Sequence, residues 1–77
     1  MIREHNSHRS DKLEKYMNRV VKVTFKSGNS CVGLLGRLGW RYEVQDCDWF
    51  SSDGAETYHF HGVAFCHSNV KQVEVLK

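Results

Sequence analysis

The sequence predicts a small, mainly β domain in which one N-terminal helix precedes five antiparallel strands that form a strongly bent small barrel. Three observations support this prediction. The chain has only 77 residues and no proline, so it has room for a single core. Apolar and polar residues alternate in several segments after residue 19, as expected for half-buried strands. Glycines interrupt one of these segments, and glycine inside a strand commonly marks a sharp bend.

The N-terminal region divides into an arm and a helix. Residues Met1–Arg9 are polar and show no apolar period, so we expect a disordered arm there and a domain over residues 10–77. The spacing predicts a helix over residues 11–18. Its signals are an N-cap and first turn followed by an apolar stripe at i, i+3 and i+4: Ser10 and Asp11, then Leu13, Tyr16 and Met17.

Five later segments have the composition or the alternation of strands: 20–26, 30–38, 41–46, 57–66 and 70–76. In the first of them, Val21, Val23 and Phe25 share one face. In the third, Tyr42 and Val44 share one face in the same way. These faces are the expected walls of the core.

The connections also carry signals. Ser27–Asn29 is a turn between two alternating runs, which predicts an antiparallel hairpin. Gly33 and Gly36 predict that the second strand curves strongly enough to turn the corner of a closed barrel. The connector at His67–Asn69 is short enough to be a single 3₁₀ turn.

Charge is distributed unevenly along the chain, although the formal net charge is only +2. Residues 1–45 carry nine Lys or Arg against four Asp or Glu. Residues 46–56 then hold four acidic residues and no basic one, which predicts a solvated acidic loop. Trp49 and Phe50 lie inside this acidic block, where they either dock on a partner or tuck back over the barrel.

Basic residues gather on the predicted helix and first strand: Lys12, Lys15, Arg19, Lys22 and Lys26. Cations placed in this way can track phosphates along one side of a ring. A row of surface lysines more often serves solubility alone, and both interpretations stay open at this stage.

Several function classes lack support in the sequence. No apolar run approaches the ~20 residues that span a bilayer, and no signal-peptide core precedes the domain, so we expect a soluble cytoplasmic protein without a membrane partner. Cys31, Cys47 and Cys66 have no CxxC spacing and are expected to be reduced thiols. No nucleophile and base occur in a supporting motif, so we expect neither enzyme activity nor a cofactor.

One pattern raises the question of a metal site. His59 and His61 lie two apart on a predicted strand and therefore point to one face, with Cys66 and His67 following closely. A His-x-His pair with no third ligand at fixed spacing more often marks a polar strand face. We therefore predict no metal site.

Two motifs, in order, resemble those of the Sm-like (LSm) family. The first comprises Val21–Val23, Gly28 and Gly33–Leu35, and the second is Phe65–Val73, a short turn flanked by hydrophobic residues. The resemblance covers residues 13–76 and implies an N-terminal helix, a five-stranded bent barrel, ring assembly and binding of single-stranded RNA. The short, divergent form is most similar to Sm-like proteins of bacteria and their phages.

The chain departs from the family pattern at the residues that the family uses to bind uridine. The Asp and Asn positions of the first motif fall on Gly39 and Glu43, and the Arg-Gly pair of the second motif falls on Cys66 and His67. These departures predict a relaxed sequence preference in place of uridine selectivity.

Five residues remain as candidates for binding RNA. Trp40 and Tyr42 offer aromatic faces for stacking, and Arg37 and Arg41 flank Trp40 with cations that attract phosphate. His67 is a substitute polar contact in the second motif. Trp40 has a second interpretation, in which it covers the end of the barrel or packs against a neighbouring subunit.

We therefore expect a non-enzymatic protein that forms a homo-oligomeric ring of about five to seven subunits and binds single-stranded RNA. A domain this small gains stability by self-association. The apolar segments 57–66 and 70–76 are expected at sheet edges, where neighbouring copies can pair with them. The alternative is an oligomeric protein-interaction scaffold that has lost RNA binding.

Overall fold

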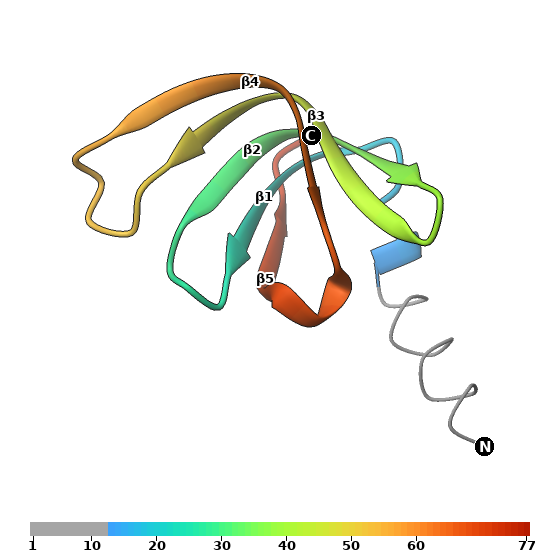
Figure 1. Cartoon of the computed structure of the whole chain (residues 1–77). Helices are drawn as coiled ribbons and strands as arrows, with labels where there is room; N and C mark the ends of the chain where they lie inside the picture. The colour runs from blue at the N-terminus through green and yellow to red at the C-terminus, as the bar shows by residue number, and fades with distance from the viewer. Residues whose placement is uncertain (1–12) are drawn as a thin grey trace.

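A computed structural model describes residues 13–77 of the chain. Its strands are β1 (Val20–Phe25), β2 (Ser30–Leu38), β3 (Arg41–Phe50), β4 (Thr57–Phe65) and β5 (Val70–Val75). They form one antiparallel sheet in the order β4-β3-β2-β1-β5 (Figure 1). The 3₁₀ turn η1 (His67–Asn69) joins β4 to β5, as predicted. None of the helical turns in this part of the chain has the length or apolar character needed to cross a bilayer.

A short helical turn, and not the predicted helix, leads into β1. The Tyr16 N–H donates to the carbonyl oxygen of Leu13 at 3.0 Å, an i to i+3 hydrogen bond. Asn18 then adopts a φ of 63°, and its N–H donates to the carbonyl of Leu35 on β2 at 2.9 Å. The chain leaves the helical conformation at Asn18, so residues 13–18 form only this short helical turn. The predicted arm and the first two positions of the predicted helix lie outside the described residues.

Strand bounds follow the prediction closely except in β3. β2 has the predicted ends, and β1, β4 and β5 each stop one residue earlier than expected. β3 continues to Phe50, so the first half of the acidic block is strand and the loop is confined to residues 51–56. Asp46 and Asp48 are exposed on either side of Cys47, which is completely buried. The predicted solvated loop is therefore wrong for this half, because β3 stays paired with β2 and β4 through the acidic residues, with an interruption at Asp46.

The bend of the sheet centres on Gly33. The register between β2 and β3 shifts at this glycine, and Asp46 on β3 has a φ of 51°. A Cβ atom on Gly33 would lie 2.6 Å from the carbonyl oxygen of Gln45 and 2.9 Å from Cβ of Cys47. Only glycine lets the two backbones approach this closely, so the glycine predicted to bend β2 does so as part of a β-bulge.

The core lies on the inner face of the bent sheet. Its buried hydrophobic residues are Leu13, Val21, Val23, Cys31, Leu35, Tyr42, Val44, Cys47 and Phe65. The predicted inward faces of the first and third strands are therefore correct. The Phe65 ring lies edge-on to Phe25, with centroids 5.3 Å apart, and is stacked with Tyr42 at 6.2 Å. Trp49 is partly buried and packs against this core, so of the two interpretations it follows the one in which it tucks back over the sheet, and Phe50 is also partly buried.

The sheet is bent like a barrel but does not close by hydrogen bonding. β4 and β5 are its two edge strands, and no pairing joins them within residues 13–77 (Figure 1). The predicted closed barrel is therefore wrong in this respect, because β4 and β5 stand at opposite ends of the sheet order and neither outer edge has a ladder partner among the described residues. Such edges are available for pairing with another chain.

Candidate nucleic-acid interface

The turn between β2 and β3 presents the most exposed aromatic side chain of the described residues. Gly39 opens the turn with a φ of 64°, a backbone conformation that glycine adopts without steric cost. Trp40 follows and is 71% exposed. The guanidinium carbon of Arg41 lies 4.8 Å from the centroid of the Trp40 ring. The turn thus displays an aromatic ring with a cation beside it, the pairing that single-stranded nucleic acids favour.

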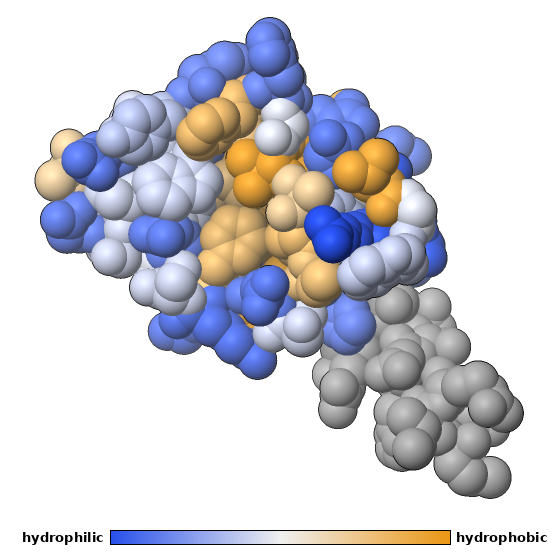
Figure 2. Space-filling view, in the orientation of Figure 1, coloured by the Kyte–Doolittle hydropathy of each residue, from blue (hydrophilic) through white to orange (hydrophobic). Residues whose placement is uncertain are grey.

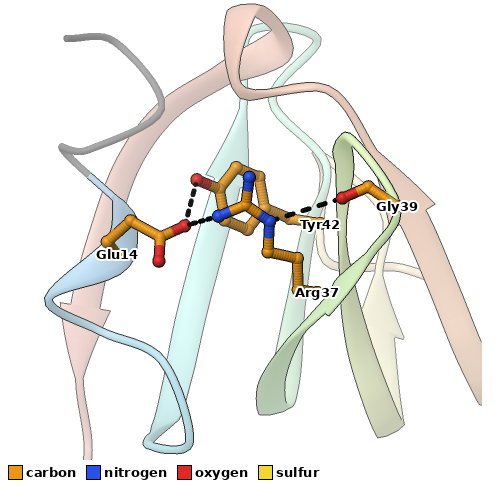
Figure 3. A network of polar contacts seen from close by, with 4 residues as sticks. All are labelled: Glu14, Arg37, Gly39 and Tyr42. Atoms are coloured by element: carbon orange, nitrogen blue, oxygen red, sulfur yellow. Dashed lines mark hydrogen bonds and ion pairs between the residues drawn. The ribbon is translucent and has the colours of Figure 1, made fainter. Parts of the chain in front are cut away.

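A polar network holds this turn in place (Figure 3). The Nε of Arg37 donates to the carbonyl oxygen of Gly39 at 3.3 Å, and its Nη1 forms an ion pair with Glu14 on the helical turn. The phenol of Tyr42 donates to the same Glu14 carboxylate oxygen at 3.0 Å. The Glu14 carboxylate therefore contacts one residue on each strand that flanks Trp40, Arg37 on β2 and Tyr42 on β3.

The network changes the roles expected for two candidates. Tyr42 is 1% exposed and lies in the core, so it offers no stacking surface to a base, contrary to the prediction. The reason is that it shares the inward face of β3 with Val44. Arg37 directs its guanidinium to Glu14 and Gly39, and the guanidinium carbon lies 5.6 Å from the Tyr42 ring centroid. Both residues position the turn.

His67 lies at the same end of the sheet as this turn. Tyr42 and Phe65 form the last pair at one end of the β3–β4 ladder. The β2–β3 turn, which precedes Tyr42, and η1, which follows Phe65, therefore lie at the same end. The Nε2 atom of His67 is buried and has no hydrogen-bond partner among residues 13–77. Buried polar atoms are normally satisfied, so this nitrogen stands out among the polar atoms of the described residues.

The histidines on β4 make a different arrangement from a metal site. His59 contacts two carboxylates of β3, with Nδ1 3.0 Å from Asp48 Oδ1 and Nε2 3.2 Å from Asp46 Oδ1. The hydrogen bond to Asp48, followed by the charges of both aspartates, raises the pKa of His59. His61 and Cys66 do not join them, and residues 13–77 contain no cluster of three or more potential metal ligands.

Aromatic residues line the outer edge of the sheet at β4. Tyr58 and Phe60 are 48% and 41% exposed, and the Tyr58 ring lies 5.9 Å from the Trp49 ring on β3. A groove of about 630 Å³ runs over them and extends to Gly62 and Val63. Figure 2 shows hydrophobic side chains gathered in the middle of the face where β4 runs down to η1, with hydrophilic residues around them.

Sequence reasoning missed Glu14, which organises the turn, and Lys71, which lies beside η1 on β5. Nothing in the local pattern around Glu14 distinguishes it from a solvent-facing helical residue. Its partners lie 23 and 28 positions away, and only the folded sheet brings them together.

Comparisons with known proteins bear on the fold. No protein-family model and no curated protein matches the chain. A heptameric archaeal Sm protein matches with a TM-score of 0.66 and 16% identity, over 87% of this chain and 98% of that one. The Pyrococcus abyssii Sm protein in complex with a uridine heptamer matches with a TM-score of 0.63 and 15% identity, over 84% and 93%.

A chain from the NatC complex bound to CoA is equally similar, with a TM-score of 0.67, 15% identity and 84% of both chains covered. Identities this low establish the fold alone. The chain therefore has an Sm-like fold, as its two motifs imply, and this fold occurs both in an Sm protein solved with uridines and in a chain of a protein complex.

Proposed function

We propose that this protein is a non-enzymatic, ring-forming Sm-like protein that binds single-stranded RNA with a relaxed sequence preference. The observation that carries the proposal is Trp40, which is 71% exposed beside Arg41 on a turn that the Glu14 network holds in place. An exposed tryptophan beside a cation offers a free face on which a nucleobase stacks at a gain of ~1–3 kcal/mol.

The relaxed preference follows from the residues near the turn. The positions that match the family's Asp and Asn hold Gly39 and Glu43, so the side chains that would read a uracil edge differ. Stacking on Trp40 and attraction to Arg41 do not depend on base identity. His67 is the nearby polar group that remains for a base or phosphate contact.

Ring assembly is supported by the two sheet edges. β4 carries the exposed aromatics Tyr58 and Phe60, and the β5 end carries Val75 and Leu76, which are 37% and 45% exposed. Main-chain pairing of one β4 edge with the β5 edge of the next copy would cover both sets. Two heptameric Sm proteins with the same fold are consistent with a homo-oligomer of about five to seven subunits.

The test of RNA binding is fluorescence anisotropy with labelled oligo-U, oligo-A and mixed-sequence RNA at low and high salt. Trp40→Ala should weaken binding to all three by ~1–3 kcal/mol. Leu38→Ala is the matched control, because Leu38 is a 51% exposed apolar residue next to the same turn but has no ring. Tight, uridine-selective binding that survives Trp40→Ala would place the RNA site elsewhere.

The second candidate function is an oligomeric protein-interaction scaffold. Two observations favour it: Arg37 and Tyr42 are committed to an internal network, and a chain of the NatC complex has the same fold. Absence of binding to any of the three RNAs at low salt, with the oligomer intact, would decide for the scaffold.

A further inference from the structure

A second polar surface lies around η1, at the same end of the sheet as the β2–β3 turn but lined by other elements. A groove of about 660 Å³ opens between the helical turn before β1, the segment that follows β1, η1 and the start of β5. Six polar residues that line it are Lys15, Lys26, His67, Ser68, Lys71 and Gln72. The groove is held together by main-chain bonding, since the N–H of Lys26 donates to the carbonyl of Asn69 at 2.9 Å.

Positive charge dominates this groove. Lys15, Lys26 and Lys71 come from three separate parts of the chain, and none of the acidic residues within 13–77 lines the groove with them. Within residues 13–77, none of the three lysines forms an ion pair. Three lysines that line one groove without a neighbouring carboxylate create a positive potential there, which attracts an anion.

Uncharged donors complete the lining. The hydroxyl of Ser68 and the amide of Gln72 can donate to phosphate oxygens. His67 adds the buried Nε2 that lacks a partner among the described residues. A groove lined by three lysines together with uncharged donors is suited to an oxyanion.

We propose that this groove binds the phosphodiester backbone of the single-stranded RNA whose base stacks on Trp40. The inference rests on the proposed function and assigns it a second contact area. Lysines are flexible point charges that bind phosphate without selecting a base. They are also spread along an open groove, which fits successive phosphates of a strand better than one small anion.

The experiment compares the salt dependence of binding in two double variants of equal charge change. Lys26→Gln/Lys71→Gln removes two groove lysines, and Lys22→Gln/Lys77→Gln removes two exposed lysines that do not line the groove. Short labelled oligo-U and oligo-A are titrated over a range of salt, after circular dichroism has shown that both variants are folded. The groove variant should lower the log–log salt slope by about 1.4, because each phosphate contact on a single strand contributes about 0.7.

The outcomes separate the groove from the stacking site. The groove proposal predicts an equal loss for oligo-U and oligo-A, a near-wild-type slope for the control variant, and an unchanged slope for Trp40→Ala. If Trp40→Ala weakens binding but the two lysine variants behave alike, the groove is refuted and RNA binding stands. If wild type binds no RNA at low salt, both proposals fail.

A competitor distinguishes RNA from an acidic protein as the occupant. Unlabelled oligo-A should displace labelled RNA from wild type much better than poly-glutamate at the same concentration of negative charge. If poly-glutamate displaces labelled RNA from wild type as well as oligo-A does, and this displacement is lost in the groove variant, the proposal is overturned. The groove would then be assigned to an acidic polypeptide.

Discussion

The phenol of Tyr42 donates a hydrogen bond of 3.0 Å to Oε2 of Glu14, across 28 positions of sequence. Arg37 forms its ion pair with the same carboxylate oxygen (Figure 3). Glu14 therefore connects the segment before β1 to both strands that support Trp40. Through this carboxylate, the N-terminal turn sets the geometry of the proposed RNA-stacking surface.

Tyr42→Phe tests this connection. The substitution keeps the ring in the core but removes the donor to Glu14, so we expect a loss of about 1 kcal/mol in the free energy of unfolding. Urea denaturation followed by circular dichroism measures it. Tyr58→Phe is the control, since Tyr58 is 48% exposed, and should stay within about 0.5 kcal/mol of wild type. Equal stability of Tyr42→Phe and wild type would show that the bond adds nothing.

Gly33→Ala should be the most damaging small substitution in the sheet. Its Cβ would lie 2.6 Å from the backbone oxygen of Gln45, which cannot move without breaking the bulge, so we expect a loss of about 1–3 kcal/mol. Gly36→Ala is the matched control, because its nearest neighbour is the end of the flexible Gln45 side chain at 3.1 Å. Thermal unfolding should separate the two variants, and similar melting temperatures would contradict the assignment of the bend to Gly33.

Phe60→Glu should dissociate the oligomer without unfolding the subunit. Phe60 is 41% exposed on the edge strand β4, so a charge there opposes burial against another copy but leaves the core intact. Sedimentation velocity measures the oligomeric state. His61→Glu introduces the same charge at the next residue, which lies on the other face of β4, and should retain assembly. A wild-type monomer at micromolar concentration would rule out the ring.

The His59 contacts should stabilise the fold more in acid than in base. Because the pKa of His59 is raised above 6.5 in the folded state, its contribution is complete below that value and is lost as pH rises through the raised pKa. His59→Gln should therefore lower the melting temperature more at about pH 5.5 than at about pH 9.

The aspartates supply the control for this pH dependence. When Asp46→Asn and Asp48→Asn are already present, adding His59→Gln should have the same effect at both pH values. If the effect of His59→Gln still depends on pH in this background, a group other than the two aspartates raises the pKa of His59.

The three thiols should differ in reactivity. Burial raises the pKa of Cys31 to about 12 and also raises that of Cys47, so neither forms much thiolate near neutral pH. Cys66 is partly exposed and should be the first to react with iodoacetamide, as mass spectrometry can show. Cys66→Ser should abolish labelling of the native protein, whereas denaturant should expose the remaining two. Rapid native labelling of Cys31 would contradict its burial.

Much of the fold was predictable because its signals are local. The hairpin turn at Ser27–Asn29, the glycine in β2 and the short connector at His67–Asn69 each act within a few residues. The length of β3 was not predicted, because Asp46 and Asp48 give that stretch the composition of a loop. Its strand character rests on one buried residue between them, Cys47, which composition cannot reveal.

The site was predictable only in part, and Tyr42 shows why. Alternation places Tyr42 on the same face as Val44, and that face is the core. The sequence therefore contained the signal against a stacking role, but the aromatic character of the residue pointed the other way. Glu14 carried no such signal, because its role exists only when Arg37 and Tyr42 meet it in the folded sheet.

The bulge at Gly33 has a consequence for the number of subunits in a ring. The β4 and β5 edges are unlike, so copies joined through them follow one another head to tail, and each step rotates the next copy by a fixed angle. A closed cycle of seven needs about 51° per step and one of five needs about 72°. The curvature of the sheet sets the angle between its two edges, and two irregularities contribute to it, the bulge at Gly33 and the register shift between Thr24 and Phe25 in the β1–β5 ladder. In the proposed ring, a substitution at Gly33 would therefore change the angle between neighbouring subunits and with it the number of subunits that closes the cycle.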